Sequence, residues 1–294
     1  MNIRGLMKRA QPLILKFSGQ LPFCPWSSVL SSVDPRTLRA HPPAMNIKVI
    51  AEEGDIKKLQ FDGRQEMWFP GHTTADLQLW GEYLSVFWEH PANGHYYLSH
   101  GTGISPGDVC IDCGCCEGTF AVQALAAGAG KVVCIEPNPY MIRCLEKTFA
   151  GEIKSGRVVI RQAALAAFCG SAAFSFNAAY PSFGQLGGKE AKEDLSVQVE
   201  VPVETIDHIC DALGLNRVIF IKMDIEGAEI QAVEGARGVL TKHHPKLALT
   251  TYHRQYDFQC LQAILSSLNY KSIRATGLTA FGGQPFRPIM LHGL

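Results

Sequence analysis

The chain has 294 residues, 47% of them hydrophobic and 18% charged, which is enough apolar sequence for one large domain with an extension and argues against global disorder. Its 27 basic and 27 acidic residues cancel to a net charge of zero, so a broad phosphate-binding face, and with it a nucleic-acid partner, is not expected. No apolar run approaches the ~20 residues of a membrane-spanning helix.

Residues 1–45 are predicted to form a loose leader that is rich in basic residues and proline. Four basic side chains precede the first acidic one, Asp34. The apolar run Pro12–Leu15 is too short for a signal peptide. We therefore expect either a loose leader or an overlong start with Met45 as the true initiator, and folded sequence from about Asn46.

Residues 46–98 are predicted to form a small α/β extension or cap. Ile47–Ala51 and Lys58–Phe61 are expected to pair as a hairpin, which could support a homodimer. Thr74–Trp88 has the apolar spacing of a helix. The polar, aromatic segment 90–97 lies just before the first strand of the next domain and could cap a ligand pocket.

Residues 99–294 form the third predicted domain, which opens with one βαβ unit of a doubly wound sheet. In chain order its parts are the strand Val109–Ile111 ending in Asp112, the turn Cys113–Gly118, the helix Thr119–Ala127, the strand Lys131–Ile135 and Glu136. An acid about 20 residues after a glycine turn is placed to accept hydrogen bonds from ribose hydroxyls. The unit therefore predicts an adenosine-bearing cofactor, with Glu136 on its ribose.

The glycine spacing indicates which cofactor this is. A dinucleotide site needs G-x-G-x-x-G, whereas this turn has only Gly114 and Gly118. Asp112, just before them, disfavours a pyrophosphate but suits the cationic methionine end of S-adenosylmethionine. The methyl donor is thus favoured over NAD, and an NAD-dependent oxidoreductase stays the alternative. A turn whose glycines serve packing alone is also consistent with the pattern.

Ten cysteines are present, and four of them crowd this turn. Neither the spacing of a zinc ribbon nor the C-x-x-x-C-x-x-C of a radical iron–sulfur site occurs. We predict buried or half-buried thiols in a reducing compartment, no metal on these cysteines and a cytoplasmic protein.

The alternation of helices and strands continues after Glu136. A polar insertion, Tyr180–Asp194, is a candidate substrate-binding loop. The predicted elements are the helix Asn138–Phe149, the strand Arg157–Arg161, the strand pair Ser171–Phe176 and Val197–Val201, the helix Thr205–Leu213, the strand Val218–Ile221 and a final pair, Lys271–Ala275 and Pro288–His292.

A second dense cluster, Lys222–Glu229, follows a strand that reads as buried on both faces. Because this strand end lies beside the glycine turn in a doubly wound sheet, Asp224 should approach the reacting centre. Glu226 and Glu229 could share one helical face or act as ordinary helix caps. A divalent metal held by Asp224 with either of them is left open, and no metal site is predicted.

Four segments, in this order, resemble the FkbM-type S-adenosylmethionine-dependent methyltransferases: Asp112–Gly118, Glu136–Pro139, Gln162–Leu165 and Lys222–Glu229. The resemblance covers roughly Tyr97 to Thr276. It implies a class I methyltransferase (Rossmann-like) fold, an α/β architecture with a seven-stranded, mostly parallel sheet, its last strand antiparallel, and helices on both faces. The family's turn usually has Ala and Asn where this chain has Cys115 and Cys116.

The resemblance further implies methyl transfer to an oxygen of a small acceptor such as a sugar, a polyketide or a lipid-linked glycan. Cofactor contacts are expected from Asp112, Gly114, Cys116, Gly118, Glu136, Pro137, Gln162, Ala163 and Asp224. An alcohol must lose its proton during the transfer, and Asp224 and His253 are the candidate bases. A catalytically silent relative is the remaining alternative, because the two cysteines alter the turn.

Overall fold

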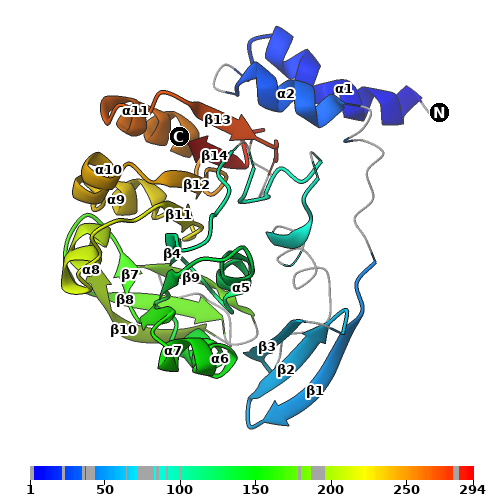
Figure 1. The fold of residues 1–294 in the computed structure, drawn as a ribbon. Helices are drawn as coiled ribbons and strands as arrows, with labels where there is room; N and C mark the ends of the chain where they lie inside the picture. Colours follow the sequence, from blue (N-terminus) through cyan, green and yellow to red (C-terminus); the bar gives the residue numbers. More distant parts are fainter. Residues whose placement is uncertain are drawn as a thin grey trace.

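The structure is a computed structural model (Figure 1). It describes residues 3–21, 24–34, 37, 44–63, 65–71, 83, 86–90, 92–99, 101–177, 180–186, 196–280 and 285–294. Within these residues the chain builds a seven-stranded central sheet, a four-stranded sheet beside it and a three-stranded sheet before it.

The central sheet has the strand order β13-β14-β12-β11-β4-β5-β6. Its strands are β4 (Val109–Cys113), β5 (Lys131–Ile135), β6 (Val158–Arg161), β11 (Phe220–Met223), β12 (Lys246–Thr250), β13 (Ile273–Thr276) and β14 (Met290–Gly293). Only β14 runs antiparallel to its neighbours, and the other pairings are parallel. The predicted seven-stranded, mostly parallel sheet with an antiparallel last strand is confirmed.

Apolar residues on both faces of this sheet explain why helices cover it on both sides. Consecutive strand residues point to opposite faces. Ile111 and Ile221 pack with the helices α8 (Ile206–Ala212), α9 (Glu229–Glu234), α10 (Arg237–His243) and α11 (Asp257–Ser267). Cys110 and Phe220, the preceding residues, pack with α5 (Thr119–Ala126), α6 (Pro139–Thr148) and the three-stranded sheet. A short helix, α7 (Ala150–Lys154), follows α6.

The four-stranded sheet follows β6. Its strands are β7 (Ala164–Leu165), β8 (Gly170–Asn177), β9 (Tyr180–Leu186) and β10 (Ser196–Glu204). The predicted pairing of the segments around Phe176 and Val197 is confirmed, because β8 and β10 are antiparallel. The insertion begins with a strand, β9, where a loop was expected, and residues 187–195 lie outside the described part of the chain. Its role in substrate binding stays a prediction.

The three-stranded sheet consists of β1 (Ile47–Glu53), β2 (Ile56–Phe61) and β3 (Gln65–Pro70). The predicted hairpin is confirmed, and β3 is an addition. It lies beside α6, where the Trp68 backbone N–H donates to the Thr148 hydroxyl at 2.9 Å (Figure 1). Of the predicted helix Thr74–Trp88, residues 74–82, 84 and 85 lie outside the described part.

The leader differs from its prediction, since its described residues include the helices α1 (Ile3–Phe17) and α2 (Trp26–Val33). Leu21, Cys24 and Val29 form a small apolar cluster with Leu278 and Phe286 of the last domain. Apolar contacts between distant segments therefore hold this part of the chain. The division into three domains stays a prediction. Among the described residues, no helix has both the length and the apolar character to cross a membrane.

Candidate functional site

The predicted site residues converge at one edge of the central sheet. Cys113 pairs in register with Ile135 of β5 and with Met223 of β11, so these three strands end side by side. Glu136 and Asp224 are the next residues along their strands, and the glycine turn starts after Cys113. In open α/β sheets ligands bind beyond the carboxyl ends of the strands.

The glycine turn needs glycine at two positions. Gly114 has a φ of +69°, and a Cβ placed there would lie 1.9 Å from the carbonyl oxygen of Asp224. Gly118 has a φ of +89°, and a Cβ there would lie 2.5 Å from the ring of Phe149. Both glycines thus have a packing role, and their contact with a cofactor stays a prediction. The turn leaves room only for backbone beside Asp224.

A buried ion pair lies beneath the turn. Asp112 is fully buried, and Lys222 Nζ lies 3.0 Å from its Oδ1. Nζ also donates a hydrogen bond to the carbonyl oxygen of Gly114 at 2.6 Å. Burial raises the pKa of Asp112, and the neighbouring ammonium opposes that rise. Burial would lower the pKa of Lys222, but the carboxylates of Asp112 and Asp224 outweigh it and raise that pKa.

Glu136 is held by backbone groups on both sides. Its Oε2 accepts from the Cys116 N–H at 3.1 Å, and its Oε1 accepts from the Asn138 N–H at 2.9 Å. Burial raises the pKa of Glu136 to about 7, although these two hydrogen bonds oppose the rise. The carboxyl is therefore fixed in place at the end of β5.

The other residues expected at the cofactor lie along the same edge. Pro137 is half-buried and follows Glu136. Gln162 is exposed and follows β6, whereas Ala163 is fully buried. Within the described part of the chain, no hydrogen bond or ion pair joins these three side chains to Asp224.

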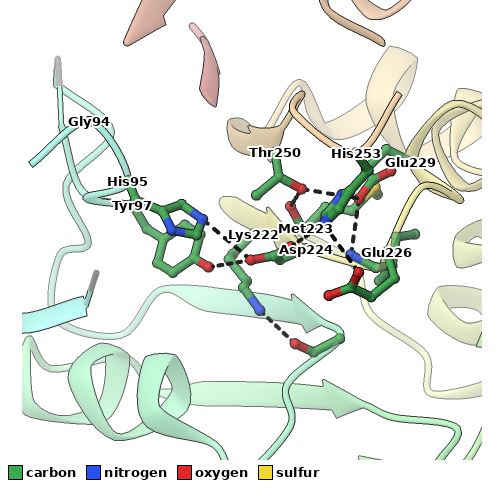
Figure 2. A network of polar contacts seen from close by, with 12 residues as sticks. Gly94, His95, Tyr97, Lys222, Met223, Asp224, Glu226, Glu229, Thr250 and His253 are labelled. Atoms are coloured by element: carbon green, nitrogen blue, oxygen red, sulfur yellow. Dashed lines mark hydrogen bonds and ion pairs between the residues drawn. The ribbon is translucent and has the colours of Figure 1, made fainter. Parts of the chain in front are cut away.

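Asp224 is the centre of a polar network (Figure 2). Tyr97 Oη donates to its Oδ2 at 2.9 Å, and His95 Nε2 lies 3.4 Å from the same oxygen. His253 Nε2 approaches Oδ1 from the other side at 3.6 Å. Burial would raise the pKa of Asp224, but its contacts with His95 and the nearby cations His253 and Lys222 hold that pKa well below its usual range.

His253 lies among three carboxylates. Its Nδ1 is 2.9 Å from Glu229 Oε1, and its Nε2 is 3.5 Å from Glu226 Oε2. Burial would lower the pKa of the ring, but the hydrogen bond with Glu229 and the charges of Asp224 and Glu226 raise it to about 9. In this arrangement the ring is protonated at neutral pH, so it has no free lone pair with which to act as a base.

Two glutamates complete the cluster. Glu229 is fully buried, and its Oε1 also accepts from the Ile225 N–H at 3.1 Å and the Thr250 hydroxyl at 3.0 Å. Glu226 has a φ of +55°, which is uncommon for a residue other than glycine. Burial raises the pKa of Glu226 to about 7, with His253 opposing the rise.

The sequence prediction missed His95 and Tyr97 as individual residues of this network. They lie in the segment 90–97, which was expected to cap a pocket, and Tyr97 is 127 residues from Asp224 along the chain. The buried hydroxyl of Thr250 was missed as well. The aromatic, histidine-containing run at 90–97 was the available signal, but it did not indicate that His95 and Tyr97 would contact Asp224.

Comparisons with known proteins bear on the fold and the family of this chain. Residues 112–272, which are 161 of the 294, match the family described as the methyltransferase FkbM domain. A comparison with curated proteins finds no match. Among solved structures, the chain is similar to a methyltransferase FkbM from Methylobacillus flagellatus KT at 22% identity, with a TM-score of 0.50 over 68% of this chain. The likeness covers 46% of that protein, so this chain spans about half its length.

Two further solved structures have weaker similarity. A precorrin-6y C5,15-methyltransferase from Geobacter metallireducens GS-15 is 13% identical, with a TM-score of 0.38 over 69% of this chain and 87% of its own. A SAM-dependent O-methyltransferase from Thermotoga maritima is 13% identical, with a TM-score of 0.35 over 65% of this chain and 60% of its own. Because the matched family segment covers more than half of the sequence and the predicted class I fold is present, the chain belongs to the FkbM methyltransferase domain family.

Proposed function

We propose that this protein transfers the methyl group of S-adenosylmethionine to a hydroxyl oxygen of a small acceptor such as a sugar, a polyketide or a lipid-linked glycan. The observation that carries the proposal is the meeting of the glycine turn, Glu136 and Asp224 at adjacent strand ends in a chain of the FkbM family. That edge of the sheet is where a doubly wound fold binds its ligand.

The turn and Glu136 fit an adenosine-bearing cofactor. Two ordered backbone N–H groups hold the Glu136 carboxyl, whose remaining lone pairs suit ribose hydroxyls. Gly114 keeps side-chain atoms out of the space between the turn and Asp224. Asp112 is fully buried and paired with Lys222, so we assign it support of the turn through the Lys222–Gly114 hydrogen bond.

The methyl group of the cofactor is already a strong electrophile when bound, so the residues of this chain mainly have to orient an acceptor oxygen and take its proton. Asp224 is the proposed hydrogen-bond acceptor for that hydroxyl, because Tyr97 holds its Oδ2 by a hydrogen bond and the His253 ring lies near its Oδ1 on the opposite side. His253, protonated in this arrangement, opposes the effect of burial on the pKa values of Asp224 and Glu226. It can serve as a base only after it has lost a proton.

Calorimetry tests the cofactor. We expect S-adenosylmethionine and S-adenosylhomocysteine to bind one per chain and NAD to show no binding. Replacing Glu136 by Ala should weaken both by roughly tenfold or more, as expected for lost hydrogen bonds to a charged group. Glu146→Ala, on the exposed face of α6, is the control and should bind as the wild type does. Binding of NAD alone would favour the oxidoreductase.

Turnover tests the acceptor and the role of Asp224. A panel of glycosides and polyketides, assayed with isotopically labelled methyl donor, should contain a substrate. Asp224→Asn should then lower the rate by about 100-fold while cofactor affinity changes much less, and Asp211→Asn, an exposed site, should be neutral. Cofactor binding without turnover on any acceptor class would favour a catalytically silent relative.

A further inference from the structure

The proposed function does not explain why several carboxylates surround the imidazole of His253. Asp224, Glu226 and Glu229 all contact His253, whose side chain is 5% exposed. We call these four residues the carboxylate cluster (Figure 2). Asp224, Glu229 and His253 each have a ligand atom within 4.8 Å of the others, and Glu226 Oε2 lies 3.5 Å from His253 Nε2. Three carboxylates facing one ring leave a local excess of negative charge that a cation would offset.

The buried nitrogen of His253 points into this excess without a hydrogen bond. Within the described residues its Nε2 makes none, although Asp224 Oδ1 lies 3.6 Å away and Glu226 Oε2 lies 3.5 Å away. These separations exceed the 2.7–3.2 Å that is usual for an N–H···O bond. They are close to the roughly 3.0–3.5 Å between neighbouring donors on one ion with bonds of about 2.1 Å.

The opposite side of the ring has the support that a metal-binding histidine usually has. Nδ1 is hydrogen-bonded to Glu229 Oε1, and Glu229 is itself fixed by the Thr250 hydroxyl and the Ile225 N–H. A carboxylate that accepts from the second ring nitrogen sets the tautomer and aims Nε2 at the metal. Glu229 Oε2 is buried too and has no hydrogen-bond partner within the described residues.

We propose that the carboxylate cluster binds one divalent cation, with His253 Nε2, Asp224 Oδ1 and Glu226 Oε2 as ligands and Glu229 as the residue that orients the ring. Two carboxylates and one imidazole form a mixed set of oxygen and nitrogen donors that suits an ion such as Mn²⁺. Three protein ligands leave coordination positions for water or an acceptor oxygen. The binding of the ion stands on its own, and only its role rests on the proposed function: it would hold the acceptor hydroxyl and ease loss of its proton.

The alternative to a bound metal ion is a proton on His253 Nε2, in which case the ring is an imidazolium surrounded by carboxylates. Direct titration separates the two. Protein stripped with a chelator and dialysed is titrated with Mn²⁺, followed by calorimetry and by the loss of the free-ion electron paramagnetic resonance signal. We expect one saturable site per chain in the wild type. Mg²⁺ and Zn²⁺ are titrated in the same way to rank the ions.

Matched variants identify the ligands. Glu226→Gln, on the more exposed side of the cluster, and Asp224→Asn should each weaken Mn²⁺ by about tenfold or more, and Glu229→Gln by about 10- to 100-fold through loss of ring orientation. Glu146→Gln and His208→Gln are exposed and should not change the affinity. Circular dichroism checks each fold, and Glu226→Gln, with its side chain 24% exposed, keeps the test decisive if Glu229→Gln does not fold.

Two results would overturn the proposal: wild-type protein that shows no saturable Mn²⁺ binding up to millimolar ion, or binding that Glu226→Gln and Asp224→Asn leave unchanged. Affinity for S-adenosylmethionine is measured on the same stripped samples. Cofactor binding without ion binding removes the metal site and leaves the proposed function intact. Ion binding without cofactor binding removes the proposed function and leaves the metal site intact.

Discussion

The backbone N–H of Cys116 donates a hydrogen bond to Glu136 Oε2 at 3.1 Å, so the glycine turn after β4 holds the carboxyl at the end of β5. This bond links the two parts of the proposed cofactor site. It also places a carboxyl group in a buried position, 5% exposed, where ionisation is costly.

Glu136 should therefore make the free energy of unfolding depend on pH. Its pKa rises from 4.5 in the unfolded chain to about 7 in the folded one, so the folded state binds its proton more tightly. The contribution of this group is most favourable below pH 4.5 and is lost as the pH rises to about 7, by roughly 3 kcal/mol in all.

Glu136→Gln should remove that part of the dependence. The wild type and the variant are unfolded with urea, without cofactor, at pH 5 and at pH 8. For each protein this gives the change in the free energy of unfolding between the two pH values, and these two changes are compared. The variant should gain stability relative to the wild type at the higher pH. Glu146→Gln should follow the wild type, and equal slopes for Glu136→Gln and the wild type would show that Glu136 is not protonated in the folded state.

Gly114→Ala should destabilise the protein by roughly 3 kcal/mol. The new Cβ would lie 1.9 Å from the carbonyl oxygen of Asp224, and the φ of +69° already disfavours a side chain. Gly151→Ala is the matched control, because it lies in the helix α7 with no atom near its added Cβ. The control should be neutral or up to about 1 kcal/mol more stable. Similar denaturation midpoints for the two variants would contradict the close approach at Gly114.

The central sheet was predictable because its strands are short apolar runs separated by helical patterns, and because Asp112, Glu136 and Asp224 each stand at or just past a strand end. The strand β3 could have been predicted too. Asp62 and Gly63 form a turn with positive φ at both residues, and Asp-Gly between apolar runs is a strong hairpin signal.

The carboxylate cluster was only partly predictable. Asp224, Glu226 and Glu229 are close in sequence, but His253 lies three residues past the end of β12. The residues that contact the cluster are as distant, since Thr250 ends β12 and Tyr97 lies in a segment before the sheet. Contacts between residues so far apart have no local periodicity. The charge state of His253 also depends on which carboxylates surround the ring, and sequence spacing does not give that.

Lys222→Met should cost about 3–5 kcal/mol, because it leaves the carboxyl of Asp112 buried without its cation. Adding Asp112→Asn should recover part of the loss, since the double variant has no buried charge at this position. A double-mutant cycle by chemical denaturation measures the coupling between the two residues. Strictly additive losses would mean that the ion pair does not form, and the support that it gives to Gly114 would have to come from elsewhere.

Cys116→Asn should make the protein slightly more stable. Cys116 has a φ of +45°, in the left-handed region, which asparagine occupies far more readily than most residues. The FkbM-type turn usually has asparagine at this position, so the side chain should fit. We expect a gain of up to about 1 kcal/mol, or a rise of about 2 °C in Tm. Cys169→Asn, at an exposed cysteine without a positive φ, is the control and should leave Tm unchanged. A lower Tm for Cys116→Asn alone would show that the thiol makes a stabilising contact worth more than the backbone strain it imposes.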